Sequence, residues 1–539
     1  MVVEVNAETI GRAARRDMQI AVPVRPAVRR GVRLRRSGDT VVLDGADRPQ
    51  AFTGRFARDH LTQLVAACDG TLGHRDLAAR TGLDEGTVYK SLALLWAAGA
   101  VEEGDPPGAL PAAAPEFACL LSRLGNSTGA NRSWTGAARR LARTVVHLAG
   151  DPSLVATAAR CLDGAGRPVT GELRPAAAGE DGLSVFFETR GSAPDLAALR
   201  RRCWTEGRPL LRVRVGATAV TVGPYVDPAF TPCLECGTAA EGAPDGDPPA
   251  GTGDLVAGLV THHVTALVGR ATMTHLPLDA AEVDLSTLAT RYRAAVTRPG
   301  CPTCSFAAGV RAAEPPAAAR YEAAVAIPPR RFLDPKGHLA HYQSANIALS
   351  SQFRTWPTCP RRPLPAADLT RLAGEPAGGT GRRPGPREVA LLLAVAFGVR
   401  EQSPVDGAVR RWTAAAGNIG SATAYLLCRD DTVLPAGAYA YVEQEHALAG
   451  MASGTPPPGN RPLLLVITAN LRKVVRKYGT FGLRLALLDA GCAVAAARAV
   501  AGHLGLAYDL ARDFDDDVLA ECLGLLPSDE PVAAVLELG

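Results

Sequence analysis

Two Cys-x-x-Cys pairs restrict the fold of this sequence more than any other feature. Cys233 and Cys236 form the first pair, Cys301 and Cys304 form the second, and 64 residues lie between the pairs. Each pair presents two thiolates on one tight turn, and two such turns complete the four-sulfur shell that structural zinc prefers. A redox dithiol is the alternative, but the surrounding sequence shows no thioredoxin-like pattern. We therefore predict a closed, structural Zn²⁺ site that joins two distant segments.

Proline-rich segments divide the 539 residues into separate parts. A chain of this length holds about three to four domains. The first join is the Pro/Ala segment 104–116, and the second lies near Pro315 and again at Pro328 and Pro329. The predicted domains are 1–105, 115–330 and 331–539.

The first domain shows the plan of a winged helix. Residues 31–45 alternate apolar and polar side chains on both sides of a Ser-Gly-Asp turn, which predicts a β-hairpin. Helices follow at 61–65, at 74–81 before Gly82, and after the capping residue Asp84, as far as Gly99. Residues 1–30 are Arg-rich, and we expect them to be irregular.

Winged helices commonly bind DNA, which is the first interpretation to test for this domain. The helix that would enter the groove, 85–98, carries Lys90 as its only cation, and Asp84 and Glu85 stand at its start. A DNA reader presents a basic face there. The formal net charge of +4 on the whole chain gives no electrostatic case for nucleic acid either. Peptide binding is therefore the favoured interpretation.

The second domain begins as a nucleotide-binding fold would, but its phosphate loop is altered. A strand at 144–149 leads into Gly150-Asp151-Pro152-Ser153-Leu154-Val155 and a helix at 153–162. Pro and Val replace the second and third glycines of the dinucleotide motif, and Asp151 stands where phosphate would lie. Further strands are expected at 183–187, 210–215 and 219–222, with a helix at 256–267. We predict that neither ATP nor NAD binds here.

The first 330 residues resemble a known family. The winged-helix plan, STGANRS at 127–133, the altered nucleotide strand, VGPYVDPAFTPCLEC at 222–236 and CPTC at 301–304 are similar to the E1-like, ThiF-type leader-binding proteins of thiazole/oxazole-modified peptide biosynthesis. The resemblance covers about residues 20–330. It implies that the N-terminal domain captures the leader of a precursor peptide, which would add a strand to the sheet edge.

Three segments carry the information in the third domain. RRWTAAAGNIGS (410–421) precedes an apolar strand, and its small residues would let the backbone approach a flat ring while the Asn418 amide bonds the ring edge. VRKYG (475–479) precedes FGLRLALLDAG, and FDDD (514–517) lies near the end. Together they resemble the nitroreductase-like, FMN-dependent SagB-type dehydrogenases, which oxidise azolines to azoles. This match spans about residues 338–539.

The second resemblance implies roles for particular residues. Lys477 and Tyr478 match the catalytic pair of the family, and six residues match flavin-contacting or family positions or stand in for them: Arg411, Ala416, Gly417, Asn418, Arg484 and Arg354. The usual Arg-Arg-Ser phosphate clamp is absent, and Arg354, Arg361 and Arg362 are its only stand-ins. Leu510-Ala511-Arg512 replaces a glycine pair, and Cys492 stands where His is usual.

The lysine count supports the same assignment. Only Lys90, Lys336, Lys473 and Lys477 are lysines, so 54 of the 58 basic residues are arginine. A lysine in this background is expected where a group must lose its proton, which arginine cannot do. Aromatising a thiazoline removes a proton and a hydride, and a lysine of lowered pKa can take the proton. The alternative is that Lys477 is a solvated helix cation.

The sequence thus predicts an α/β and α+β multidomain protein: a winged-helix domain, a degenerate E1-like domain with a Cys₄ zinc site, and a nitroreductase-like FMN domain. Its expected activity is FMN-dependent oxidation of thiazolines and oxazolines in a leader-bearing precursor, in a thiopeptide-like pathway. The alternatives are a non-catalytic scaffold that recruits the cyclodehydratase and a free-standing nitroreductase. Expected partners are the precursor, the cyclodehydratase and a second copy in a homodimer.

The chain carries no predicted membrane or export segment. Its longest strongly apolar run, Val389–Val399, is shorter than the ~20 residues of a membrane span. The first residues, MVVEVNAETIGRAARRD, lack the apolar core of a signal peptide. We expect a cytoplasmic protein that binds neither membrane nor nucleic acid.

Overall fold

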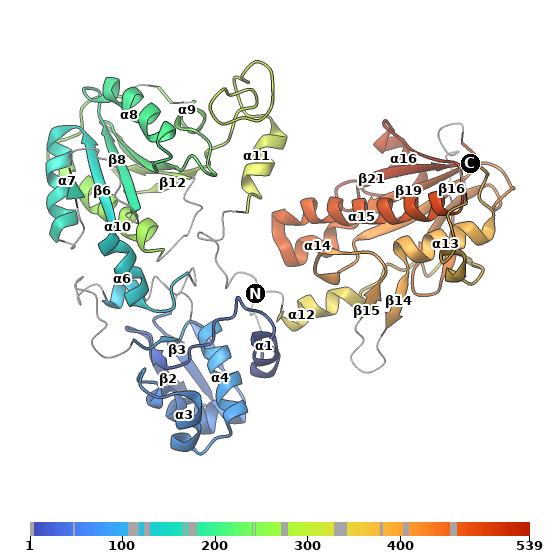
Figure 1. Ribbon diagram of the computed structural model, residues 1–539, viewed down its shortest axis with the longest axis horizontal. Helices are drawn as coiled ribbons and strands as arrows, with labels where there is room; N and C mark the ends of the chain where they lie inside the picture. The colour runs from blue at the N-terminus through green and yellow to red at the C-terminus, as the bar shows by residue number, and fades with distance from the viewer. Residues whose placement is uncertain are drawn as a thin grey trace. The chain divides into compact units, whose positions relative to one another are not determined.

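The computed structural model describes residues 5–46, 49–105, 118–122, 130–164, 169–170, 181–239, 241–242, 244–270, 279–327, 342–377, 381–402, 409–452 and 461–539. Its contacts form two compact units, Val5–Leu339 and one whose main body is Ala340–Gly539 (Figure 1). The first two predicted domains therefore belong to one unit. The joins predicted at 104–116 and at Pro328–Pro329 lie almost wholly outside the described residues, as do residues 127–129 of the STGANRS segment.

The N-terminal part contains the predicted hairpin and helices. Strands β2 (Arg33–Ser37) and β3 (Thr40–Asp44) form the hairpin around Gly38 at φ +60°, and β4 (Gln50–Phe52) completes a sheet of order β2-β3-β4. Strand β1 (Pro26–Val28) pairs with β5 (Val101–Glu103). The helices are α2 (Thr62–Ala67), preceded by a π-helical turn at Ala57–Leu61, α3 (His74–Thr81) and α4 (Glu85–Ala97).

The expectation that residues 1–30 are irregular is wrong for Ala7–Ala14, which form helix α1, and for Pro26–Val28, which form β1. The Asn6 side chain caps this helix by accepting from the Thr9 amide at 2.8 Å. Ile10 is fully buried, and a Cβ built on Gly11 would lie 2.5 Å from the Cβ of Lys90 on α4. The close approach to α4 stabilises a helix too short to form alone.

A seven-stranded sheet of order β12-β11-β10-β9-β8-β6-β7 follows. Strands β7, β6, β8 and β9 are parallel, and β9 to β12 pair antiparallel. Alternate residues of β8 face opposite sides: Val185 and Phe187 belong to the core cluster that includes α7 and α10, whereas Phe186 belongs to the cluster that includes α8. The bounds are α6 (Trp134–Arg143), β6 (Thr144–Gly150), α7 (Pro152–Gly164), β7 (Val169–Thr170), β8 (Asp181–Glu188), α8 (Ala193–Thr205), β9 (Leu210–Val215), β10 (Ala219–Val226), α9 (Leu234–Gly237), α10 (Thr252–Gly269), β11 (Ala280–Asp284), β12 (Thr290–Arg293) and α11 (Ala317–Ala324).

The second unit is built on an antiparallel sheet of order β13-β18-β17-β16-β19-β21-β20. In the apolar strand β19, Leu465 and Ile467 face helices α13 and α15, whereas Leu464 and Val466 face α16. The bounds are α12 (Ser344–Ile347), β13 (Arg361–Pro363), α13 (Pro386–Phe397), β14 (Val399–Gln402), β15 (Val409–Arg411), β16 (Ala422–Cys428), β17 (Gly437–Val442), β18 (Ala447–Met451), β19 (Leu463–Ala469), α14 (Leu471–Tyr478), α15 (Gly482–His503), β20 (Tyr508–Leu510), α16 (Asp516–Leu523) and β21 (Val532–Leu538). The whole chain is thus a mixed α/β, multidomain fold.

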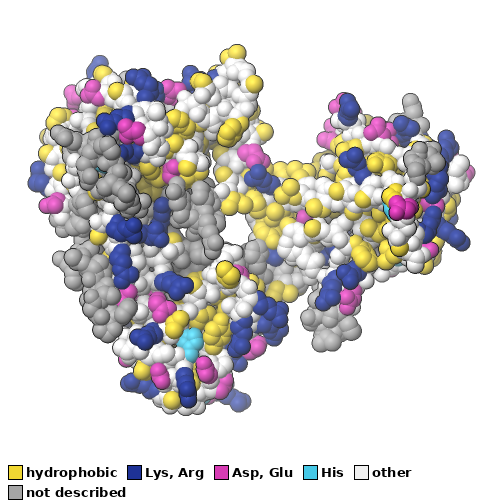
Figure 2. Space-filling model, viewed as in Figure 1, with side chains coloured by type: hydrophobic (Ala, Val, Ile, Leu, Met, Phe, Trp, Pro, Cys, Tyr) yellow, Lys and Arg dark blue, Asp and Glu magenta, His cyan; other side chains and the backbone are white. Residues whose placement is uncertain are grey.

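Among the described residues, one helical stretch, Leu471–His503, is long and apolar enough by length and composition to cross a membrane, and 44% of its most apolar window is buried. Ala490, Ala493 and Ala497 on its sheet-facing side lie in the core. On its other side Leu487 and Leu488 are exposed, and Figure 2 shows hydrophobic side chains gathered along this helix. The run Val389–Val399 noted in the sequence is mostly helix α13, whose Leu391, Leu392 and Leu393 are buried.

Candidate functional site

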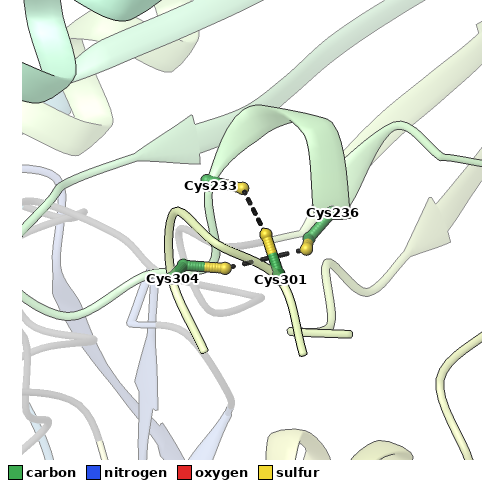
Figure 3. Close-up of side chains that lie close together, drawn as sticks. All are labelled: Cys233, Cys236, Cys301 and Cys304. Atoms are coloured by element: carbon green, nitrogen blue, oxygen red, sulfur yellow. Dashed lines mark hydrogen bonds between the residues drawn. The ribbon is translucent and has the colours of Figure 1, made fainter. Parts of the chain in front are cut away.

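The four cysteines of the two pairs meet in one cluster (Figure 3). All four Sγ atoms lie within 4.8 Å of one another. Cys233 directly precedes helix α9, and Cys236 lies within this short helix. Cys301 and Cys304 lie on a loop after β12. The Sγ atoms of Cys233 and Cys301 are 3.7 Å apart, and those of Cys236 and Cys304 are 3.6 Å apart. The predicted meeting of the two pairs is confirmed.

The cluster has the dimensions of a tetrahedral zinc site. Four sulfurs at about 2.3 Å from a central ion lie about 3.8 Å from one another, close to the spacings seen here. The Arg298 amide donates to Cys236 Sγ at 3.4 Å. This donor stabilises a thiolate, the form in which cysteine binds metal. The residues therefore fit Zn²⁺.

In the altered phosphate loop after β6, an aspartate side chain occupies the place where a phosphate would bind. Asp151 Oδ1 accepts from the amides of Ser153 and Leu154 at 3.1 Å each, at the start of α7. These are the helix N-terminal amides that would hold a phosphate. A Cβ on Gly150, at φ +103°, would overlap the carbonyl of Phe187. The Asp151 carboxylate thus occupies the position at the start of α7 where an anion would bind.

In the second unit the Ala-Gly-Asn turn meets the Lys-Tyr pair. Gly417 has φ +56°, and a Cβ built on it would lie 2.6 Å from Nζ of Lys477 and closer still to the hydroxyl of Tyr478. Lys477 Nζ lies 5.3 Å from the centre of the Tyr478 ring. Burial lowers the pKa of Lys477, whereas burial and the charge of Asp489 raise that of Tyr478. Both side chains are half-buried, so Lys477 is not a fully solvated helix cation.

The carboxylate of Asp489, on α15, holds the Ala-Gly-Asn turn in place. The sequence analysis did not single out this residue. Its side chain is 5% exposed and accepts from the Ala416 amide at 2.7 Å and from the Ser421 hydroxyl at 2.6 Å. Burial raises the pKa of Asp489, in opposition to the hydrogen bond from Ser421. The aspartate of the LLDAG motif was the available signal, since a carboxylate on an apolar helix face needs partners.

The other residues predicted for the flavin have partners within the protein. The Asn418 amide donates to the Val409 carbonyl at 2.6 Å, so it joins the turn to β15. Arg411 donates to the Asn418 carbonyl at 3.0 Å and to the Ser350 carbonyl at 3.2 Å, and its Nε is buried without a partner. Its guanidinium packs so closely on Gly420 that a Cβ there would lie 2.5 Å from Arg411 Cζ. These residues shape the turn.

Lys473, one helical turn before Lys477, is the most perturbed amine of the described residues, and the sequence reasoning did not single it out. It is 8% exposed, donates to the Gly420 carbonyl at 3.3 Å, and lies 5.9 Å from the centre of the Phe353 ring. Burial and the charge of Arg411 lower its pKa to about 8, whereas Glu443 opposes the shift. The scarcity of lysine was the signal that could have found it.

A cleft of about 870 Å³ opens beside Lys473. Arg354 lines it, but its guanidinium pairs with the buried carboxylate of Glu530. Arg361, another stand-in for the phosphate clamp, pairs with Glu445 at 2.8 Å on edge strand β13 and does not line the cleft. The remaining lining residues are Gln352, Phe353, Asn470, Arg472, Lys473, Val475, Arg476, Gly524, Leu526 and Asp529.

The remaining predicted positions are spread over the second unit. Arg484 lies in the first turn of α15 and is partly buried, Cys492 is exposed on the same helix, and Arg362 lies on β13. Leu510 ends strand β20 at the sheet edge. The structure thus brings Gly417, Lys477 and Tyr478 together, and it places Lys477 outside the lining of the cleft.

Comparisons with known proteins give fold-level matches of low similarity. No protein-family model and no curated protein matches the chain. Among solved structures, the heterocyclase TruD is 16% identical with a TM-score of 0.41, covering 81% of this chain and 64% of its own. A heterocyclase in complex with substrate and cofactor is also 16% identical, with a TM-score of 0.40, covering 52% and 39%. A Ralstonia eutropha structure assigned as a nitroreductase is 19% identical with a TM-score of 0.27, covering 35% and 92%.

This chain therefore spans less than two thirds of the length of either heterocyclase. Because each TM-score is below 0.5, the functional proposal rests on the residues of this chain and not on these matches.

Proposed function

We propose that this protein is an FMN-dependent azoline dehydrogenase that oxidises thiazolines and oxazolines to azoles in a leader-bearing precursor peptide. The meeting of Lys477 and Tyr478 at Gly417 carries the proposal. This arrangement packs an amine and a phenol directly against a turn that carries no side chain at Gly417. An amine of lowered pKa is the group that removal of a ring proton requires.

The reaction removes a proton and a hydride from each azoline ring. When bound, FMN supplies the hydride acceptor. The Lys477 amine, whose pKa is lowered by burial, takes the ring proton, and the Tyr478 hydroxyl orients the substrate or relays that proton. Arginine at position 477 would stay protonated and could not take this part.

The turn around Gly417 lies in contact with both catalytic side chains. The absence of a Cβ at Gly417 lets Lys477 Nζ and the Tyr478 hydroxyl pack directly against the turn. The Ala416 amide and the Asn418 side-chain amide already donate within the protein. We therefore assign the ring contacts to Lys477 and Tyr478, with Arg411, Asn418 and Asp489 as positioning residues.

The N-terminal part would bind the leader of the precursor. Sheet β2-β3-β4 ends in two strands, each paired on one side only among the described residues, so either can accept a peptide strand. DNA binding is disfavoured because Lys90, the only cation of α4, pairs with Glu8 at 3.2 Å. The cyclodehydratase of the pathway would then act on the same bound precursor.

The proposal also includes a structural metal ion, a homodimer and a cytoplasmic location. Zn²⁺ would hold the two Cys pairs together as a structural ion. The exposed apolar side chains of Val475, Leu487 and Leu488 suit the proposed homodimer, since a second copy would cover them. All twelve cysteines are unpaired, which suits the proposed cytoplasmic location.

The direct test uses an azoline-bearing precursor with and without its leader, incubated with the protein and with or without added FMN. Mass spectrometry should show the loss of two hydrogen atoms per ring, dependent on FMN and faster with the leader present. Turnover that ignores the leader would favour a free-standing nitroreductase acting on small molecules.

A non-catalytic scaffold is the second candidate, because Arg411, Ala416 and Asn418 all find partners inside the protein. In that case the purified protein would bind no flavin, while it would still bind the leader and the cyclodehydratase. A yellow protein with flavin absorbance excludes this candidate.

A further inference from the structure

The cleft beside Lys473 is lined by more positive than negative side chains. Four cations line it, namely Arg354, Arg472, Lys473 and Arg476, against the two carboxylates of Asp529 and Glu530. Its volume of about 870 Å³ falls within the range of small-molecule sites, roughly 300–1,000 Å³. The cleft adjoins the Gly417 turn through Lys473, which bonds the Gly420 carbonyl, and through the Asn470 amide, which bonds the Ser421 carbonyl at 2.8 Å.

Two of the four cations lack a carboxylate partner among the described residues. Arg354 pairs with Glu530, and Arg472 pairs with Asp529 at 3.0 Å. Arg476 is bonded only to the neutral side-chain amide of Gln352, at 3.4 Å. Lys473 is bonded to a backbone carbonyl, although it is almost completely buried. Burying an amine without a bonded carboxylate is costly, so a site that keeps one favours an anionic ligand.

We propose that this cleft binds the phosphate group of FMN, and that Lys473 and Arg476 are the cations that hold it. The inference rests on the proposed function, because that function supplies the flavin. The two residues lie on α14 and would take over the part of the Arg-Arg-Ser clamp that this sequence lacks. Phe353, Val475 and Leu526 give the cleft apolar walls for the rest of the molecule.

The charges around Lys473 fix how binding should depend on pH. Burial and the charge of Arg411, on β15, disfavour its protonated form, whereas Glu443, after β17, favours it. The other charged residues that line the cleft are Arg354, Arg472, Arg476, Asp529 and Glu530. With a pKa of about 8 for Lys473, affinity for a phosphate group should be highest below pH 8 and fall as the pH rises through that value.

The experiment compares FMN with riboflavin, which differ only by the phosphate. Their dissociation constants are measured by fluorescence quenching between pH 6.5 and 9.5. We expect FMN to bind more tightly than riboflavin by about tenfold or more, the scale of one charge-assisted hydrogen bond. Lys473→Met and Arg476→Gln should each remove most of this preference and leave riboflavin binding unchanged.

Two further variants protect the test from a folding artefact. Lys473→Arg keeps a positive charge that does not titrate, so it should keep the preference for FMN and lose its pH dependence near 8. Arg461→Gln breaks an ion pair with Glu537 outside the cleft and should change neither constant.

Each outcome has one meaning. If the wild-type protein binds FMN and riboflavin equally, or if Lys473→Met and Arg476→Gln keep the full preference, the phosphate site is wrong and the dehydrogenase proposal stands. If the protein binds neither flavin, the proposed function itself fails.

Discussion

Adding a single methyl group to Gly417 should separate the catalytic pair from the turn it faces. Alanine at φ +56° carries the left-handed strain of about 1 kcal/mol. In addition, its Cβ would lie 2.6 Å from Lys477 Nζ, so that the amine must move by about an ångström. A displacement of that size at a reacting group costs on the order of 10²-fold in rate.

Gly381 provides a matched control for this substitution. Its φ of +57° is almost the same, but nothing lies within 4 Å of the position of its Cβ. Gly417→Ala and Gly381→Ala should therefore lose similar stability, a shift of about 2–4 °C in Tm for each kcal/mol in a unit of this size.

Thermal melts and azoline turnover are measured on both variants. We expect equal melts and a loss of turnover confined to Gly417→Ala. Full turnover by Gly417→Ala would refute the reasoning, because the contact between the turn and the Lys-Tyr pair would then have no part in the chemistry.

The remaining predictions address the Lys477 amine, the metal site and a buried ion pair of the first unit. Lys477→Ala should keep the fold and the bound flavin but form no azole by mass spectrometry; unchanged product would contradict the role of the amine. Atomic absorption should find one zinc per chain. In the full-length protein, Cys301→Ser or a chelator should lower the Tm of the unit 5–339 and leave the Tm of the second unit unchanged. An unchanged Tm for the unit 5–339 would contradict the structural role of the metal. Arg29→Met should cost about 3–5 kcal/mol in urea unfolding, because Arg29 and Glu102 are buried and paired at 3.2 Å; a loss below about 1 kcal/mol would show that Glu102 tolerates burial without its cation.

Local signals in the sequence were sufficient for the elements of the N-terminal part. The turn at Gly38 and the end of the helix before Gly82 are confirmed, as is the cap at Asp84, which accepts from the Thr87 amide at 2.8 Å. Such signals act over a few residues and do not depend on the rest of the fold. The Cys pairs are the one long-range feature the sequence revealed, because each pair is itself a local motif.

The parts that escaped prediction depend on contacts between distant segments. Helix α1 forms because Gly11 lies against α4, and no pattern near residue 11 in the sequence indicates that contact. Asp489 and Lys473 are polar residues on buried faces whose partners, the Ala416 amide and the Gly420 carbonyl, lie far away in the sequence. The loss of the phosphate clamp was visible in the sequence, but the cations of α14 that border the cleft were not, because helical periodicity does not show which neighbours a face will have.

Flavin absorbance during a single anaerobic turnover tests the central claim most directly. The protein loaded with FMN is mixed with an excess of azoline-bearing, leader-bearing peptide in the absence of oxygen. Wild-type protein should lose its yellow absorbance as the rings are oxidised, and Lys477→Ala should keep it although the flavin stays bound. If the wild-type protein keeps its colour, or if Lys477→Ala bleaches at the same rate, the amine at the Gly417 turn does not carry the reaction.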